Sequence, residues 1–284
     1  MFLPRRIIED KLRQILADDV GHGDITAASV IPPNLVTTAK VVAKENGVVA
    51  GVEEALILAE YLGLEAKAKV TDGEIIQNEQ VILQLNGDAQ TILCVERTML
   101  NLLSRMSGIA TKTKMLTEKL QRANKEVRIA ATRKSAPGLL YFDKKAVVVG
   151  GGDPHRLHLD DLILIKDNHL AIVGSIEEAI KKAKTNASFS KKIEVEVTNL
   201  EDAMKAAEAG ADIVMLDNFS AKEAGTASEA LRKAGFSKVI VEVSGGITAE
   251  NLVEYAEAKV DIISLGELTH SVRALNLSLE IVKE

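Results

Sequence analysis

The C-terminal two thirds of the chain repeats one pattern, in which a short aliphatic run is followed by a longer stretch rich in Ala, Glu and Lys. The aliphatic runs predict strands at 127–131, 162–165, 193–197, 213–216, 239–243 and 262–265, and a further short one at 156–159. Helices are expected between them, for example at 200–209 and 221–234. Strands joined through helices pair in parallel, so we expect a parallel α/β barrel, with an open doubly wound sheet as the second choice.

The N-terminal part of the chain has a different pattern. An amphipathic helix is expected at 7–18, and short alternating strands are expected at 37–44, 66–70 and 81–85. This mixture is typical of a small α+β domain. A helical pattern at 95–123, which could break at 107–108, is expected to link the two parts.

Composition and charge exclude several classes of protein. A formal net charge of -6 disfavours general nucleic-acid binding, which needs a basic surface. The single cysteine, Cys94, excludes an intramolecular disulfide and fits a reducing compartment. No apolar run approaches the roughly 20 residues of a membrane span, and the N-terminus lacks the apolar core of a signal peptide. We therefore expect a cytoplasmic protein with no nucleic-acid or membrane partner.

Polar side chains lie where the predicted strands end. Arg133 and Lys134 follow the first strand, Lys166 follows the second, and Glu196 and Asp217 end the next two. Barrel enzymes place their chemistry at this end of the strands, so we expect these residues to share one pocket. Positive charge concentrated in an acidic protein indicates a site for an anionic ligand, although a solvated run of charges is the alternative.

The donors gathered here suit a small ligand that carries carboxylates as well as phosphate. They are Arg133, His155, Arg156 and Lys166. Lys166 also fits a second hypothesis, a Schiff base of the kind that barrel aldolases form. That role requires the neutral amine, which is disfavoured where a cation is needed to bind phosphate and carboxylates.

Glycines after the last two strands indicate a phosphate site. Ser244, Gly245 and Gly246 lie between a strand and a helix expected to begin near residue 249, and Gly266 follows the next strand. His270, one helical turn later, could add a donor. Glycines that only make tight turns are the alternative.

Two carboxylates among these cations indicate a metal ion. Glu196 and Asp217 end consecutive strands and would hold Mg²⁺ partly through substrate phosphates. Glu194 lies on the same side of its strand but further from the expected active face, so Glu196 is favoured as the ligand. A pair of strand-end salt bridges is the alternative.

Short motifs spread over the chain carry a family resemblance. They lie at 21–26, 96–101, 107–111, 132–134, 150–152, 155–156, 165–169, 194–197, 216–219 and 243–247. Together they resemble the quinolinate phosphoribosyltransferase family over essentially the whole chain. The resemblance implies an N-terminal α/β sandwich domain at 1–103, joined by residues 270–284, followed by an incomplete parallel α/β barrel at 104–269.

The resemblance also implies an activity and an assembly. The expected reaction transfers a phosphoribosyl group from phosphoribosyl pyrophosphate to quinolinate with Mg²⁺, and it yields nicotinate mononucleotide, pyrophosphate and CO₂ for NAD biosynthesis. The expected assembly is a homodimer, or a higher oligomer of dimers, with shared active sites. In this family the residue borrowed from the neighbouring subunit matches Arg97.

Matching the motifs residue by residue implies the role of each side chain. The carboxylates of quinolinate would be held by Arg133, His155, Arg156 and Lys166. Pyrophosphate would lie near Lys134 and Lys166, and the 5-phosphate would be bound by Ser244, Gly245, Gly246, Gly266 and His270. The residues expected to act in catalysis are Lys134, Lys166, Glu196 and Asp217, the last two through Mg²⁺ and the ribose.

Ser135, Ala136, Leu140 and His158 depart from the family pattern, in which threonine follows residue 134, arginine often follows residue 139 and glycine stands at position 158. These departures leave room for another base, as in the related branch associated with molybdenum uptake. A phosphate-ligand sensor on an inactive barrel is the non-enzyme alternative. It is disfavoured because both metal-binding carboxylates and Lys134 are present.

Overall fold

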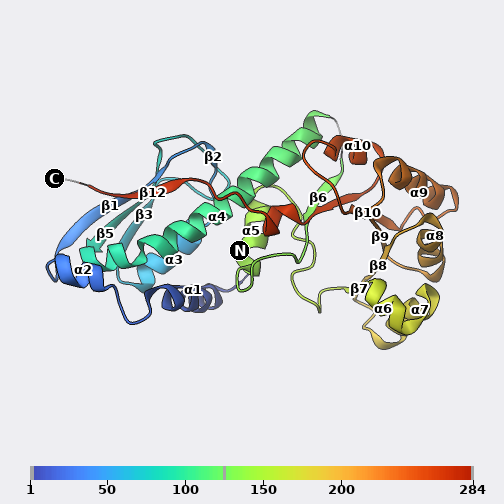
Figure 1. The fold of residues 1–284 in the computed structure, drawn as a ribbon, viewed down its shortest axis with the longest axis horizontal. Coiled ribbons are helices and arrows are strands. Elements are labelled where there is room, and N and C mark those ends of the chain that lie inside the picture. The colour runs from blue at the N-terminus through green and yellow to red at the C-terminus, as the bar shows by residue number, and fades with distance from the viewer. Residues whose placement is uncertain (1–2, 124–125, 283–284) are drawn as a thin grey trace. The chain divides into compact units, whose positions relative to one another are not determined.

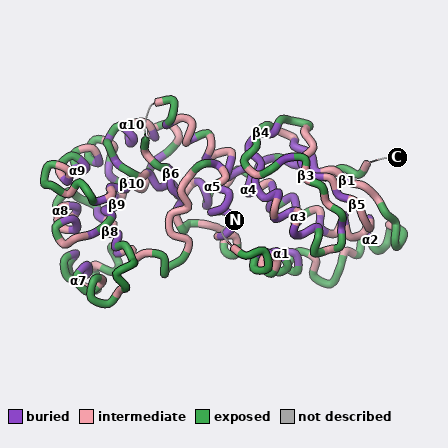
Figure 2. The backbone as a smooth tube through the Cα atoms, turned by 180° about the vertical axis from the view of Figure 1, so that it is seen from behind, coloured by how far each residue is buried: buried purple, intermediate pink, exposed green. Residues whose placement is uncertain are grey.

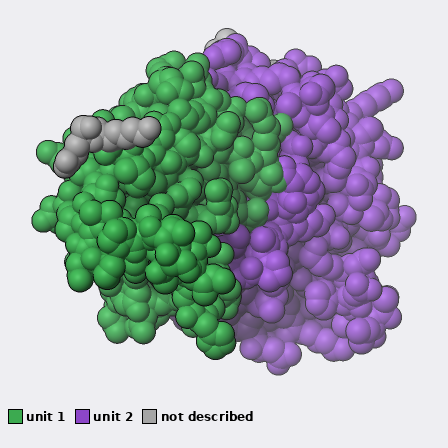
Figure 3. Space-filling view, turned by 60° about the vertical axis from the view of Figure 1, so that its left-hand side comes forward, with its two compact units in different colours: residues 1–114, 141–151, 272–284 green, residues 115–140, 152–271 purple. Residues whose placement is uncertain are grey.

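The computed structural model describes residues 3–123 and 126–282. The chain forms two compact units (Figure 3). Unit 1 comprises Met1–Lys114, Tyr141–Gly151 and Val272–Glu284, and unit 2 comprises Met115–Leu140 and Gly152–Ser271. The segment 141–151 belongs to unit 1, although it lies inside the barrel domain predicted at 104–269. The predicted domain boundaries, 1–103 with 270–284 and 104–269, stay a prediction.

Unit 1 is built on a four-stranded antiparallel sheet. The strand order is β12 (Leu277–Ile281), β1 (Val36–Ala43), β5 (Val81–Asp88), β3 (Glu65–Ala68). The C-terminal strand thus lies beside β1, the first strand of the chain (Figure 1). A short pair, β2 (Gly47–Val48) and β4 (Ile75–Ile76), lies apart from this sheet. The predicted α+β character of this part is confirmed.

The helices of unit 1 include one that the sequence pattern predicted to break. They are α1 (Arg5–Val20), α2 (Ile25–Val30), α3 (Val52–Tyr61), α5 (Leu140–Val149) and the larger part of α4 (Ala89–Arg122). Helix α4 continues through Ser107 and Gly108, so the break is not found. A Cβ at Gly108 would lie 2.1 Å from the carbonyl oxygen of Arg273. This glycine therefore allows a close approach of backbone and does not end the helix.

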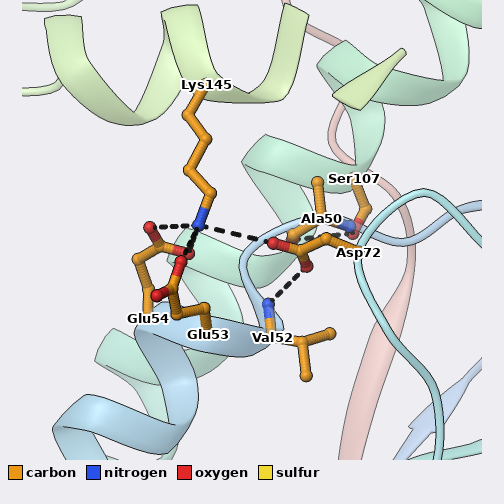
Figure 4. A network of polar contacts seen from close by, with 7 residues as sticks. All are labelled: Ala50, Val52, Glu53, Glu54, Asp72, Ser107 and Lys145. Atoms are coloured by element: carbon orange, nitrogen blue, oxygen red, sulfur yellow. Dashed lines mark hydrogen bonds and ion pairs between the residues drawn. The ribbon is translucent and has the colours of Figure 1, made fainter. Parts of the chain in front are cut away.

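Helix α5 is held in unit 1 by buried charges, and buried residues line both α3 and α5 (Figure 2). Lys145 Nζ lies 2.7 Å from Glu53 and 2.8 Å from Glu54, and it is 3.5 Å from Asp72 (Figure 4). Burial opposes the charge of Lys145, but Glu54 and the other carboxylates raise its pKa above the ordinary value. Burial raises the pKa of Glu54, and Lys145 offsets this effect.

Unit 2 contains a six-stranded parallel sheet. Its strand order is β6 (Arg128–Ala131), β11 (Ile262–Leu265), β10 (Ile240–Ser244), β9 (Ile213–Asp217), β8 (Ile193–Val197), β7 (Ile163–Ile165). Strands β7 to β11 follow one another in chain order, whereas a doubly wound sheet reverses its direction at a switch point. With β6 and β7 at the two edges, this is the predicted incomplete parallel barrel.

The strand predicted at 156–159 is wrong, because the described residues there form turns. His155 adopts a left-handed φ of 52°, and the Asp161 carboxylate accepts the N–H groups of Leu157 and His158 at 2.6 and 2.9 Å. Just before this turn, Asp153 forms an isolated bridge with Ala130. Local hydrogen bonds have replaced the strand.

Helices connect successive strands of unit 2 and lie outside them in Figure 1. They are α6 (Asp167–Val173), α7 (Ile176–Asn186), α8 (Leu200–Ala209), α9 (Ala221–Lys233) and α10 (Leu252–Glu257). A further short helix, α11 (Glu267–His270), follows the last strand, β11. Ser175, Asn199 and Ser220 cap α7, α8 and α9 through their side-chain oxygens. Within residues 3–123 and 126–282, none of the helices has the length and hydrophobicity to cross a membrane.

Candidate active site

A cavity of about 410 Å³ lies at the carboxyl ends of the parallel strands of unit 2. It brings together most of the residues predicted from the sequence: Arg133, Lys134, His155, Arg156, Lys166, Glu196, Asp217, Ser244 and Gly245. Gly246, Gly266, His270 and Arg97 are not among its lining residues. A wider hollow of about 770 Å³ in unit 1, beside Arg13 and Tyr61, contains none of the predicted residues. We therefore place the site in unit 2.

The two expected metal ligands lie at neighbouring strand ends. Glu196 is the next-to-last residue of β8, and its Oε2 accepts a hydrogen bond from Lys166 Nζ at 2.5 Å. Asp217 ends β9, and the Asn218 amide donates to its Oδ2 at 2.7 Å. Burial and the negative charge of Glu196 raise the pKa of Asp217, while Lys166 works against this rise. The two carboxylates thus interact electrostatically within one cavity.

Two guanidinium groups share the same cavity. Arg133 follows β6, and Arg156 follows the turn at His155. Burial and the positive charge of Arg133 lower the pKa of Arg156. Thr269 Oγ1 donates to the carbonyl of Lys134 at 2.7 Å and so fixes the segment after β6. Two arginines this close together favour a ligand with more than one negative charge.

His155 faces two buried carboxyl groups. Its Nε2 lies 3.1 Å from Glu242 Oε2 and 3.5 Å from Glu194 Oε2, and both acids are fully buried. Burial and the neighbouring Glu242 raise the pKa of Glu194 to about 7, although His155, Arg156 and Lys166 oppose the rise.

Sequence reasoning missed Glu242. The signal was its spacing, because it stands two residues before Ser244 in β10, just as Glu194 stands two residues before Glu196 in β8. A carboxylate at this spacing from a cavity residue shares its side of the strand, and Glu242 is itself one of the residues that line the cavity.

The glycine loop after β10 depends on a close contact. Gly245 and Gly246 both have positive φ, and a Cβ at Gly245 would lie 2.2 Å from Asn218 Oδ1. The helix expected near residue 249 begins later, at Leu252, because the side-chain Oδ1 of Asn251 accepts the N–H of Thr248 at 2.7 Å and extends the turn. Sequence reasoning quoted Asn218 within a motif but gave it no role.

Gly266 and His270 lie next to Lys134. A Cβ at Gly266 would approach the His270 ring to 2.9 Å and Lys134 Cδ to 3.2 Å. His270 is exposed, and its Nδ1 lies 2.6 Å from Ser271 Oγ. The predicted role of these residues in binding phosphate stays a prediction, and so does that of Gly246, which is exposed.

Arg97 belongs to α4 in unit 1. Its side chain is 66% exposed, and its nearest acidic group is Glu96 at 3.9 Å. The structure therefore leaves this arginine available at the surface of its unit.

Comparison with known proteins identifies the family. Two family models match the chain: the N-terminal domain of quinolinate phosphoribosyl transferase matches residues 24–107, and its C-terminal domain matches residues 109–280. The chain is 49% identical over 276 residues to a probable nicotinate-nucleotide pyrophosphorylase (carboxylating) of Methanocaldococcus jannaschii, covering 96% of each protein. It is 47% identical over 273 residues to the protein of the same name from Methanothermobacter thermautotrophicus, covering 96% of this chain and 98% of the relative.

A solved structure agrees with these matches. The nicotinate-nucleotide pyrophosphorylase of Francisella tularensis superposes with a TM-score of 0.89 at 36% identity, covering 99% of this chain and 98% of that one. Both units are thus accounted for by one set of relatives, and the chain belongs to the quinolinate phosphoribosyl transferase family.

Proposed function

We propose that this protein transfers the phosphoribosyl group of phosphoribosyl pyrophosphate to quinolinate and releases CO₂ and pyrophosphate, forming nicotinate mononucleotide for NAD biosynthesis. The observation that carries the proposal is a single cavity containing paired arginines, two lysines and two strand-end carboxylates. The names of the relatives support the same reaction.

The arginines are suited to the pyridine substrate. Arg133 and Arg156 each present a planar guanidinium that can bind a carboxylate through two hydrogen bonds. Their mutual repulsion, which contributes to the lowered pKa of Arg156, would be relieved by a bound dicarboxylate. Lys166 lines the same cavity, in contact with Glu196, and is within reach of both substrates in our proposal.

In our proposal the two lysines of the cavity bind pyrophosphate, the leaving group. Lys134 and Lys166 would stabilise negative charge on pyrophosphate as its bond to ribose C1 breaks. Ser244 and the backbone of Gly245 and Gly246 would bind the 5-phosphate, with Gly266 and His270 adding to that site from beside Lys134. These contacts hold the ribose while the pyridine nitrogen bonds to C1.

We propose Mg²⁺ as the cofactor, with Glu196 and Asp217 holding it. The residues fit a divalent cation because both offer carboxylate oxygens and because their mutual repulsion contributes to the raised pKa of Asp217. When bound, the ion would neutralise part of the charge that develops on pyrophosphate. The same carboxylates would orient the ribose.

Decarboxylation follows from the new bond. Once the pyridine nitrogen is bonded to ribose C1 it carries positive charge, so the ring can accept the electron pair of the bond to the adjacent carboxylate. CO₂ leaves and a proton takes its place on the ring carbon. The arginines must bind the substrate without stabilising the departing carboxylate more than the transition state, since only differential binding accelerates the step.

We propose that the protein acts in the cytoplasm as a homodimer, or a higher oligomer of dimers, in which the partner subunit's Arg97 completes each site. Two observations support an interface on unit 1. Arg97 is exposed on α4, and Ile25, Val30 and Val36 are apolar side chains that are 81%, 69% and 65% exposed.

The reaction is tested with purified protein, quinolinate, phosphoribosyl pyrophosphate and Mg²⁺, following nicotinate mononucleotide and CO₂. We expect product from the wild type, and a loss of about a hundredfold or more in Arg133→Ala and Glu196→Ala. Lys233→Ala, which removes a surface ion pair on α9, is the matched control and should keep full activity. If the wild type forms no product but binds phosphoribosyl pyrophosphate, the base is a different one; if no base is turned over, the protein is a binding protein.

The shared site is tested by mixing two inactive variants. Arg97→Ala keeps its own barrel residues, and Glu196→Ala keeps its Arg97. If Arg97 acts across the dimer, one site of each mixed dimer is intact, and about a quarter of the wild-type activity should return. No recovery after subunit exchange has been verified would show that Arg97 does not serve the partner's site.

A further inference from the structure

Glu242 is a buried acid that the proposed mechanism does not use. It lies in β10, two residues before the cavity residue Ser244, and it lines the floor of the same cavity although its side chain is fully buried. Glu194 occupies the matching place in β8 and is also fully buried. Glu194 Oε1 and Oε2 and Glu242 Oε1 accept no hydrogen bond from the residues that the structure describes. Such groups cost stability, so a role for them is expected at a functional site.

The His155 ring is the group that both acids face. Its Nε2 lies 3.1 Å from Glu242 Oε2, and its Nδ1 accepts the backbone N–H of Arg156 at 2.8 Å. A nitrogen that accepts a hydrogen bond carries a lone pair, so we assign the ring proton to Nε2. His155 then donates to Glu242, and both ring nitrogens are engaged within the protein.

The same assignment decides between two uses of this cluster. Histidine with two carboxylates, all with ligand atoms within 4.8 Å of one another, is also a donor set for a metal ion. A metal bond would need the lone pair of Nε2, the position that the hydrogen-bond pattern gives to the proton. The geometry therefore favours a hydrogen-bonded support over a metal centre.

The backbone at His155 is fixed as well. Its φ of 52° is left-handed, which is uncommon outside glycine. The Asp153 carboxylate accepts the His155 N–H at 2.7 Å and stabilises this turn. The turn directs the chain into Arg156, which lines the cavity. The ring of His155 thus links a buried carboxylate to the backbone of a cavity arginine.

We propose that Glu242 is a positioning residue, whose carboxylate holds the Nε2–H of His155 so that His155 fixes Arg156 to receive a carboxylate of the pyridine substrate. This inference rests on the proposed function. It differs from the role implied by the family resemblance, because His155 acts through hydrogen bonds within the protein and does not itself bind the substrate carboxylate. Glu194 lies 3.5 Å from the same Nε2 and is a second carboxyl group beside the ring.

Two variants separate the hydrogen bond from simple packing. Glu242→Leu removes the acceptor, whereas Glu242→Gln keeps an oxygen in its place. Ser264→Ala is the matched control, because Ser264 is buried in the neighbouring strand β11 and is not part of the His155 cluster. Thermal unfolding of each variant reports on the fold, and KM is measured separately for quinolinate and for phosphoribosyl pyrophosphate.

We expect Glu242→Leu to raise KM for quinolinate about tenfold or more, the effect of losing a hydrogen bond to a charged group. KM for phosphoribosyl pyrophosphate should stay within about twofold, because Lys134 and the Ser244 loop do not depend on His155 in our proposal. Glu242→Gln should recover most of the loss. An equal rise in both KM values, or no difference between the Gln and Leu variants, would overturn the inference.

The tautomer of His155 gives a second readout that needs no turnover. Nitrogen NMR of histidine-labelled protein, with the signal assigned through His155→Gln, should show protonated Nε2 in the wild type and a changed tautomer in Glu242→Leu. Protonated Nδ1 with unprotonated Nε2 in the wild type would contradict the proposal even if the Leu variant fails to fold. If the expected tautomer is found but quinolinate is not a substrate, the proposed function fails while the support of His155 by Glu242 stands.

Discussion

Buried carboxylates occur in both units, but their surroundings differ. In unit 1, the fully buried Glu54 meets Lys145 at 2.8 Å, and two further acids surround the same ammonium. In unit 2, Glu194 and Glu242 are as deeply buried, yet three of their four oxygens accept no hydrogen bond from described residues. The first cluster holds a helix in place, whereas the second borders the cavity, with Glu242 in its lining, and is expected to lower stability. Buried charge therefore serves structure in one unit and the site in the other.

The largest effect is expected from breaking the paired cluster. Lys145→Met would leave Glu54 buried without its cation, and the free energy of unfolding should fall by about 3–5 kcal/mol. Urea denaturation at neutral pH measures the change. A loss below about 1 kcal/mol would show that this ion cluster behaves as a surface pair and would remove the contrast between the units.

The next largest effect is a pH dependence of the free energy of unfolding, which arises from Glu194 in unit 2. Because the pKa of Glu194 is raised from 4.5 to about 7, the folded protein holds a proton that the unfolded chain has released across this interval. The free energy of unfolding should therefore fall as pH rises from about 4.5 to 7, by up to about 3 kcal/mol. Glu194→Gln should remove this slope in denaturation series between pH 5 and pH 8.

Lys145 provides the contrast to that experiment. Its raised pKa contributes stability that is present at all pH values below its ordinary value of 10.5 and is lost only at higher pH. Lys145→Met should lower stability at pH 8, and by less at pH 5, because the buried Glu54 that has lost its cation can take up a proton at low pH. A slope that persists in Glu194→Gln and disappears in Lys145→Met would reverse our assignment.

A smaller effect is expected at Asp217, where one substitution should raise stability and abolish activity. Asp217→Asn removes a charge that burial and Glu196 disfavour, so the metal-free protein should gain less than about 1 kcal/mol after allowance for solvent screening. The same change removes a proposed Mg²⁺ ligand and should abolish turnover. Denaturation without Mg²⁺ and an activity assay with Mg²⁺ test the two parts. Retained activity would exclude Asp217 as a necessary ligand.

The smallest effect is expected at an exposed ion pair. Lys233 and Glu229 lie 2.9 Å apart on α9, with side chains that are 74% and 64% exposed. Lys233→Ala should leave the free energy of unfolding almost unchanged, because solvent and salt screen an exposed ion pair. The urea midpoint measures this change and sets the baseline against which the buried clusters are compared.

The sequence predicted those features that follow from local periodicity. Aliphatic runs located all six parallel strands, and the rule that their carboxyl ends converge brought Lys166, Glu196 and Asp217 into one cavity. Fold class and family are therefore confirmed. The individual roles of these side chains in binding and catalysis stay predictions.

Features that depend on distant partners were not accessible from the pattern. Sequence analysis assigned no role to the consecutive charged residues Asp143, Lys144 and Lys145, yet all three are buried. Asp143 pairs with Arg105 at 2.7 Å, and Lys145 pairs with the acids of α3. Glu242 stands in an aliphatic run and gave no sign of its histidine partner. In each case the partner is far away in the sequence, and local preference carries no information about it.

The pairing of β1 with β12 affects the order in which the protein can form during synthesis. Ala39 of β1 lies opposite Ile281 of β12, and every strand of unit 2 is translated between them. One edge of β1 therefore stays open while the whole barrel emerges from the ribosome. A nascent chain with an unpaired edge is prone to pair with its neighbours, so the first-made unit of this protein is the last to be completed.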